Sequence, residues 1–216
     1  MLKRYVVLLG AVLLATASLP QAVAADAETP QQIVQSIADQ LGKAVDGHQA
    51  ELRAHPDQAI QIIDRIILPH FDTDYAALLV LGRYARQATP DQRVEFTHAF
   101  YNALTHRYAE GLLAYTQGAV KVLPSSGPLD QDRTLVRTQV QLKNGKSISV
   151  DYAFRRTSSG QWKAYDVIIE GISYITNYRS QVAAQIQKEG IDGLIKELQT
   201  QGASAVGQMQ PKGSGH

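Results

Sequence analysis

The chain has 216 residues, a formal net charge of +1 at pH 7 and no cysteine. The lack of cysteine excludes disulfides, cysteine nucleophiles and thiolate metal sites together. A charge so close to zero gives no electrostatic reason to expect binding to nucleic acid or to an anionic membrane surface.

The first 24 residues have the pattern of a secretory signal peptide. Lys3 and Arg4 precede an apolar run from Tyr5 to Ala17, and the Ala-Val-Ala sequence at 22–24 is typical of a signal peptidase cleavage site. The apolar run is shorter than the about 20 residues that a membrane-spanning helix needs. We therefore expect residues 1–24 to be removed and the mature chain to be exported without a membrane anchor, with a formal charge of −1 once Lys3 and Arg4 are lost.

Residues 25–201 are expected to form one domain, which is long enough to build a core without covalent cross-links. Apolar residues at helical spacing predict a helix over about 30–54 that is interrupted at His55 and Pro56, then a short helix that ends at Pro69, and another short helix within 72–89. Thr89 and Pro90 have the pattern of a helix start, and the helix they begin is expected to run to about residue 115.

From residue 119 the apolar period changes to two, which predicts strands. Asn144 and Gly145 form a strong hairpin signal between alternating segments, and 120–122 and 161–169 complete an antiparallel meander of about four strands with one apolar face. A last helix over about 172–188 continues after Gly190, and the tail 202–216, which is rich in Gly, Ser and Gln, is expected to be disordered. The predicted class is α+β, a curved antiparallel sheet covered by helices on its apolar face.

Asp166 and Glu170 are the natural candidates for a pair of catalytic carboxylates. Four strand residues at ~3.3 Å each would place them about 13 Å apart, whereas even an inverting glycosidase pair lies within roughly 10 Å. We therefore interpret them as exposed charges or as partners of a nearby arginine. The histidines contain no HxxxH or HExxH pattern, so neither a metal site nor another cofactor is expected.

Two segments, 67–115 and 167–198, resemble the MlaC (toluene-tolerance) family of periplasmic phospholipid carriers. The resemblance rests on VLG at 80–82, ATPDQR at 88–93 and EGIS followed by TNYRSQ within 170–181, in this order and spacing, and it covers nearly all of the mature chain. Two departures are Tyr84, where the family often has Trp, and the tail after residue 201.

The resemblance implies a fold with a deep apolar pocket that holds the acyl tails of a phospholipid, with the headgroup near the mouth. It also implies a non-enzymatic shuttle in the periplasm. The implied partners are the MlaA–porin complex of the outer membrane and the MlaFEDB transporter of the inner membrane, with which such carriers maintain outer-membrane lipid asymmetry. The cargo would be phospholipid, and no cofactor is implied.

The alternation of the strands and the apolar stripes of the helices indicate which side chains could line such a pocket. Tyr165 is expected on the apolar face of the sheet, together with Val167 and Ile169 of the same strand. For each candidate, packing in the core away from the cavity is the alternative. The candidate lipid-binding residues are Leu79, Tyr84, Tyr101, Leu104, Tyr108, Val136, Val140, Val150, Tyr152, Val167, Ile169, Tyr174, Ile175 and Tyr178.

Arg179 could meet a lipid phosphate, but an ion pair with Asp166 or Glu170 is the favoured expectation. Two other functions remain open from the residues alone. One is an isomerase or hydrolase with an apolar α+β pocket that uses Asp166 or Glu170 as a base. The other is an interaction adaptor with a solid core and no cavity.

Overall fold

The computed structural model describes residues 28–112, 119–124, 132–142 and 144–209. Helices come first, a meander follows, and helices close the chain, so the α+β class is confirmed. Before the sheet lie α1 (Pro30–Val45), α2 (Gln49–Ala54), α3 (Pro56–Ile66), the 3-10 helix η1 (Leu68–His70), α4 (Thr73–Leu81), the 3-10 helix η2 (Gly82–Arg86) and α5 (Pro90–Leu112). The sheet contains β1 (Val120–Val122), β2 (Arg133–Gln141), β3 (Ser147–Arg156), β4 (Trp162–Ile169) and β5 (Ile172–Ser173), and α6 (Tyr174–Gln201) and α7 (Ala203–Gln208) follow it.

Two helix starts follow directly from the sequence. Thr29 and Gln32 form a reciprocal capping box at α1. At α5 the Thr89 hydroxyl accepts a hydrogen bond from the Gln92 N–H at 3.1 Å, and the Gln92 side chain accepts one from the Thr89 N–H at 3.0 Å. Both boxes satisfy backbone donors that the first helical turn leaves open. The single helix expected over 30–54 is instead two helices, α1 and α2, separated by a turn at 46–48.

The strands form an antiparallel sheet in the order β1-β2-β3-β4-β5. Directly opposite residues share one face, and the register places Val136 opposite Tyr152 and Tyr152 opposite Val167. The apolar face expected from alternation is therefore present. The fifth strand, β5, has two residues and follows a tight turn at Glu170 and Gly171, so the sheet is slightly larger than the meander of about four strands.

A β-bulge at Tyr165 changes the alternation of β4. Phe154 pairs with Ala164 and Ala153 pairs with Asp166, which leaves Tyr165 without a directly opposite residue. One extra residue in a strand shifts the side chains before it to the other parity. Trp162 and Ala164 therefore share the apolar face with Val167, whereas Tyr165 does not continue it as simple alternation predicts.

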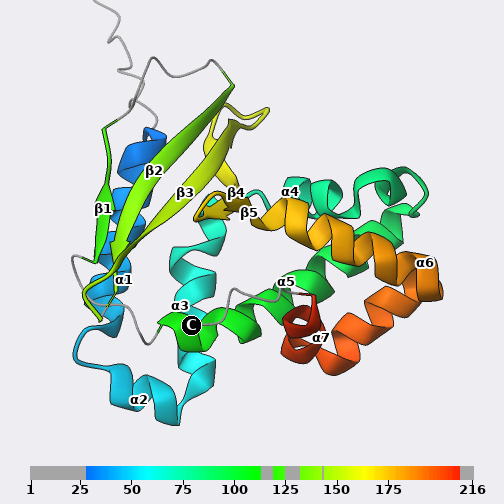
Figure 1. The fold of residues 1–216 in the computed structure, drawn as a ribbon, viewed down its shortest axis with the longest axis horizontal. Coiled ribbons are helices and arrows are strands. Elements are labelled where there is room, and N and C mark those ends of the chain that lie inside the picture. The colour runs from blue at the N-terminus through cyan, green and yellow to red at the C-terminus, as the bar shows by residue number, and fades with distance from the viewer. Residues whose placement is uncertain (1–27, 113–118, 125–131, 143, 210–216) are drawn as a thin grey trace, which may run out of the picture.

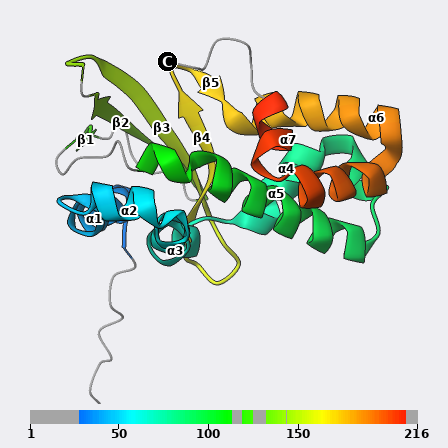
Figure 2. The same ribbon diagram turned by 90° about the horizontal axis from the view of Figure 1, so that it is seen from below.

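The sheet and the first helices form one half of the molecule, and helices α4 to α7 form the other (Figure 1). Helices α1, α2 and α3 lie on one side of the sheet, and α5 runs from there into the second helical group (Figure 2). Beneath α1 the sheet is solidly packed, because Ile33 and Val34 contact Val136, Phe154 and Trp162. None of the helices in the described part of the chain combines the length and the apolar character that crossing a membrane requires.

The C-terminal segment folds back on the helical half. At Gly190 the backbone of α6 has φ +78°, a non-helical conformation that divides the helix into two arms, as the sequence break at this glycine predicts. The second arm leads into α7, whose Ala205 and Val206 are buried and which packs on α5. The tail expected to be disordered from residue 202 is therefore helical over Ala203–Gln208, and residues 210–216 lie outside the described residues.

Arg179 joins α6 to the end of α4. Its Nε donates a hydrogen bond to the carbonyl oxygen of Leu79 at 2.6 Å, which satisfies one of the open acceptors of the last turn of α4. The expectation that Arg179 pairs with Asp166 or Glu170 is wrong, because both carboxylates have other partners. Gly82 ends α4 with φ +55° and lies directly under the arginine stem.

We predict that Gly82→Ala lowers the free energy of unfolding by about 1–3 kcal/mol. A Cβ at position 82 would lie 3.2 Å from Cδ of Arg179 and would occupy a backbone conformation that side chains avoid. The measurement is urea denaturation followed by circular dichroism. Gly111→Ala is the matched control, because that glycine is in α5 with nothing within 4 Å of an added Cβ. The control should be neutral or slightly stabilising, and equal destabilisation of both variants would contradict the role given to Gly82.

Candidate functional site

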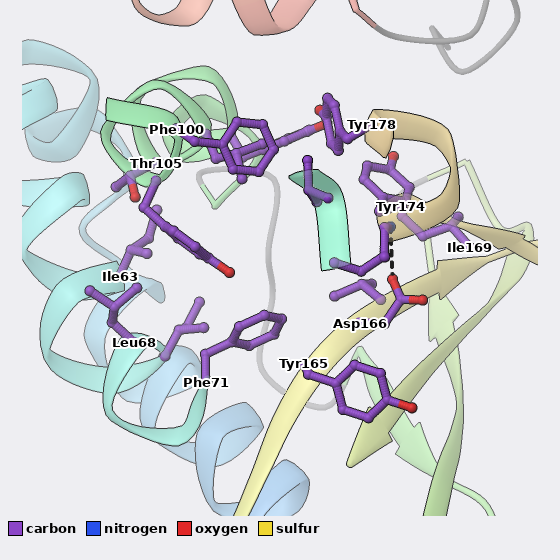
Figure 3. A pocket seen from close by; sticks show the side chains of 17 residues that line it. Ile63, Leu68, Phe71, Phe100, Thr105, Tyr165, Asp166, Ile169, Tyr174 and Tyr178 are labelled. Carbon is purple, nitrogen blue, oxygen red and sulfur yellow. Dashed lines mark hydrogen bonds between the residues drawn. The ribbon is translucent and has the colours of Figure 1, made fainter. Parts of the chain in front are cut away.

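A cavity of about 360 Å³ lies where β4, α5, the start of α6 and the α3–η1 segment meet (Figure 3). Its volume is within the roughly 300–1,000 Å³ typical of ligand pockets. Its wall is almost entirely aliphatic and aromatic. The lining residues are Ile63, Ile67, Leu68, Phe71, Val80, Phe100, Tyr101, Leu104, Thr105, Tyr108, Tyr165, Asp166, Val167, Ile169, Tyr174, Ile175 and Tyr178.

Each wall of the cavity follows from a local feature of the chain. Helix α5 presents one face, on which Tyr101, Leu104 and Tyr108 recur at helical spacing. Phe71 is held beside the sheet because its segment forms a parallel bridge with Ala164. The Asp72 N–H, one residue later, donates to the carbonyl oxygen of Ala164 at 2.7 Å. The first turns of α6 supply the wall that faces α5.

The structure brings eight of the fourteen candidate residues together in the cavity wall. The eight are Tyr101, Leu104, Tyr108, Val167, Ile169, Tyr174, Ile175 and Tyr178. The other six, Leu79, Tyr84, Val136, Val140, Val150 and Tyr152, are not part of it.

These six residues pack elsewhere for identifiable reasons. Val136 is buried beneath α1, and Tyr152 packs against the same cluster. Val140 and Val150 also lie on the sheet but outside the cavity wall, with Val140 opposite Val120 of the edge strand β1. Leu79 and Tyr84 belong to the core of the second helical group, where the Tyr84 hydroxyl accepts a hydrogen bond from Arg83 at 2.8 Å.

Nine lining residues were not among the candidates. They are Ile63, Ile67, Leu68, Phe71, Val80, Phe100, Thr105, Tyr165 and Asp166. The isoleucines of α3 recur at helical spacing, so their stripe was visible, but no sequence signal showed that it faces the sheet across a cavity. Phe100 and Thr105 each lie one position away from a residue of the recognised stripe of α5, before Tyr101 and after Leu104 respectively. Asp166 was weighed as a catalytic candidate and interpreted as an exposed charge or the partner of an arginine, so it was not proposed for the wall.

Asp166 fixes the corner between β4 and α6. Its side chain is buried, and its Oδ2 accepts a hydrogen bond from the Ser173 hydroxyl at 2.6 Å. Its Oδ1 accepts one from the Ile175 N–H at 3.1 Å (Figure 3). The Ser173 hydroxyl in turn accepts from the Thr176 N–H at 3.1 Å and caps α6. The carboxylate thus satisfies one backbone donor and the capping hydroxyl at a helix start, where a negative charge is also favoured.

Glu170 also has a structural role. It has φ +49° in the turn before β5, a conformation that is uncommon for a residue other than glycine. Its carboxylate accepts a hydrogen bond from the Ser149 N–H, and its own N–H donates to the Ser149 carbonyl at 3.0 Å. The side chain therefore extends the pairing of β3 with β4 into the turn. The interpretation as an exposed charge fits Glu170 but is wrong for Asp166, which is buried.

Three tyrosines gather where α5 faces α6. The hydroxyls of Tyr108 and Tyr178 lie 2.9 Å apart. The ring of Tyr174 lies 6.2 Å from that of Tyr108 and 6.0 Å from that of Tyr178, centroid to centroid. Burial, with a smaller contribution from Tyr108, raises the pKa of Tyr174 to about 12. We call Tyr108, Tyr174 and Tyr178 the tyrosine cluster.

Tyr101, which lies on α5 like Tyr108, has a different electrostatic environment from the tyrosine cluster. Burial raises the pKa of Tyr101, and the carboxylates of Asp72, Asp74 and Asp166 raise that pKa further. Tyr101 and Tyr174 therefore keep their protons at neutral pH. Asp166 contributes a carboxylate to the cavity wall.

Arginine side chains and tyrosine rings form a cluster next to the bulge of β4. The ring of Tyr165 contacts that of Tyr75 edge to face at 5.3 Å. The guanidinium of Arg155 lies 4.3 Å from the centroid of Tyr75 and forms an ion pair with Asp72. Such contacts are favourable because the ring face is electron-rich. Across the described ranges, no group of three His, Asp or Glu side chains is arranged to hold a metal ion.

Asp166→Ala is expected to lower the free energy of unfolding by about 2–3 kcal/mol, because two buried hydrogen bonds to a charged group are lost. Urea denaturation checks this value. Asp151→Ala is the matched control, since that carboxylate makes one exposed hydrogen bond to the Ser149 hydroxyl at 3.2 Å. The control should change stability by less than about 0.5 kcal/mol. A similarly small loss for Asp166→Ala would contradict its structural role.

Stability is expected to fall as the pH rises from about 10 to about 12, partly because of Tyr174. The unfolded tyrosine ionises near its ordinary pKa of 10, whereas the native side chain keeps its proton to about 12, so the unfolded state gains charge first. Tyr174→Phe should reduce this dependence while leaving stability at pH 8 nearly unchanged. Unfolding midpoints at pH 8 and 11 test this, and an unchanged pH dependence in the variant would contradict it.

Comparison with known proteins identifies relatives along nearly the whole chain. A relative from Haemophilus influenzae, named intermembrane phospholipid transport system binding protein MlaC, is 26% identical over 207 residues, which cover 95% of this chain and 96% of that protein. The toluene tolerance protein ttg2D of Pseudomonas putida is 29% identical over 167 residues, which cover 77% of each chain.

A solved structure shares the fold. It is a phospholipid-binding protein from Ralstonia solanacearum in complex with a phospholipid, with a TM-score of 0.73 and 27% sequence identity. The similarity covers 83% of this chain and 99% of that chain. The family model described as MlaC protein matches residues 35–200. Because this match includes both the sheet and the helices that form the cavity, the chain belongs to the MlaC family.

Proposed function

We propose that the protein is a periplasmic phospholipid carrier of the Mla pathway, which encloses acyl tails in the cavity between β4, α5 and α6. The observation that carries the proposal is this apolar cavity, set in a fold shared with a protein whose structure contains a phospholipid. The eight candidate residues in the wall are proposed to contact the bound lipid.

The energetics of lipid transfer require a site that removes most of both acyl tails from water. Two acyl chains of roughly 15 methylenes each, at ~0.8 kcal/mol per methylene, represent on the order of 20 kcal/mol of apolar exposure in water. A shallow surface patch could not offset that cost. A mainly apolar wall suffices because the binding free energy comes from apolar burial, and the headgroup can remain hydrated.

Carriage without catalysis agrees with the roles of the two carboxylates. Asp166 accepts two hydrogen bonds that fix the start of α6, and Glu170 accepts one from the backbone of β3. A general base must instead reach a substrate proton. The enzyme alternative therefore has no observation in its favour.

The pathway context extends the proposal to partners and compartment. The name of the H. influenzae relative refers to an intermembrane phospholipid transport system. By this relationship, the protein would exchange lipid with the MlaA–porin complex at the outer membrane and with MlaFEDB at the inner membrane. The signal-peptide pattern of residues 1–24 supports export to the space between them.

Native mass spectrometry of the mature protein, purified from the periplasm of an expressing cell, tests the proposal. About one co-purified phospholipid per chain is expected.

Val167→Trp should reduce lipid occupancy at least severalfold, because residue 167 lies in the cavity wall and an indole would fill part of the space. Leu135→Trp is the matched control, since Leu135 is exposed and lies outside the cavity wall. The control should keep its lipid. A lipid-free wild-type protein that cannot take up added phospholipid would overturn the proposal, as would equal occupancy in the two variants.

A further inference from the structure

The tyrosine cluster brings three hydroxyls together in a wall that is mainly apolar, although Tyr101, Thr105, Tyr165 and Asp166 also line it. Its three rings come from two helices, with Tyr108 on α5 and Tyr174 and Tyr178 on α6, and all three line the cavity. Figure 3 shows Tyr174 and Tyr178 side by side at the start of α6. The opposite wall, from α3 and η1, contributes the aliphatic residues Ile63, Ile67 and Leu68. The cavity therefore has one side with three clustered hydroxyls and another, formed by α3 and η1, that is mainly aliphatic.

Ring packing alone does not require hydroxyls at these positions. Phenylalanine would provide the same apolar surface, and burying a hydroxyl has a free-energy cost unless it is hydrogen-bonded. A phenol both donates and accepts, so adjacent phenols can hydrogen-bond to one another and also accommodate an added acceptor oxygen. Tyr174 is half-buried in the wall, which leaves it accessible to a molecule in the cavity.

We propose that the tyrosine cluster binds the glycerol-ester region of the phospholipid, with a tyrosine hydroxyl donating to an ester carbonyl oxygen and the tails lying against the aliphatic side formed by α3 and η1. The inference rests on the proposed function and deepens it. It assigns an orientation to the lipid and separates the residues that recognise its ester linkage from those that only exclude water.

The test compares a diester phospholipid with the diether analogue that has the same chains and headgroup but lacks ester carbonyls. Delipidated protein is equilibrated with an equimolar mixture, and the ratio of bound lipids is read by native mass spectrometry. Wild-type protein should prefer the diester by roughly two- to tenfold, the range of one net hydrogen bond. Tyr174→Phe and Tyr108→Phe, tested separately, should move the ratio towards one.

Tyr84→Phe is the matched control, because Tyr84 lies outside the cavity wall and its hydroxyl partner is Arg83. It should keep the wild-type ratio. Using both cluster variants preserves the test if one of them fails to fold, which circular dichroism would show. A thermal melt separates a loss of stability from a change in lipid preference.

Three outcomes would overturn the inference. The first is a wild-type ratio of one. The second is a ratio that stays at the wild-type value in both cluster variants, which would mean that the hydroxyls contact phosphate or only one another. The third is loss of preference in Tyr101→Phe instead, which would place the ester groups at the other side of the cavity. A wild-type protein that binds neither lipid would contradict the proposed function itself. This outcome differs from the three above, so the two kinds of failure can be distinguished.

Discussion

The buried carboxylate of Asp166 holds the start of α6 against β4, and the cavity depends on that junction. Residues before the corner, such as Val167 and Ile169, and residues after it, such as Tyr174 and Tyr178, form walls on two sides of the same space. An isolated buried carboxylate would be costly, but this one is satisfied by a hydroxyl and a backbone N–H. The helix start gains an acceptor and the carboxylate gains donors. The two hydrogen bonds of this carboxylate therefore hold β4 and α6 together at the corner. The other side chains that β4 and α6 present to the cavity are mostly apolar.

The apolar face of the sheet serves two purposes along its width. Under α1 it is filled, since Ile33 and Val34 close over Val136 and Phe154. At the end of β4, side chains of the strand, of α5 and of the start of α6 leave a cavity between them. The same property, an uncharged face, thus produces rigid packing at one end and binding space at the other. A carrier needs both, because the packed part keeps its shape while the cargo changes.

This division explains how much the sequence could predict. Alternation in β2, β3 and β4 correctly predicted one apolar face, and helical spacing in α5 correctly predicted its lining stripe. Periodicity could not distinguish Val136 from Val167, because both obey the same alternation and differ only in which helix lies above them. The bulge at Tyr165 was also invisible, since it depends on the register with β3 rather than on any residue type. Composition misjudged 203–208 as well, because the burial of Ala205 and Val206 depends on α5, far away in the chain.

The single tryptophan of the chain has a consequence for optical experiments on this protein. Trp162 is buried in the packed region under α1 and is not among the residues that line the cavity. Five of the ten tyrosines line the cavity, whereas Tyr152 packs against the cluster of Trp162. Indole emission therefore reports on the integrity of the sheet and α1 and not on the walls that meet the cargo.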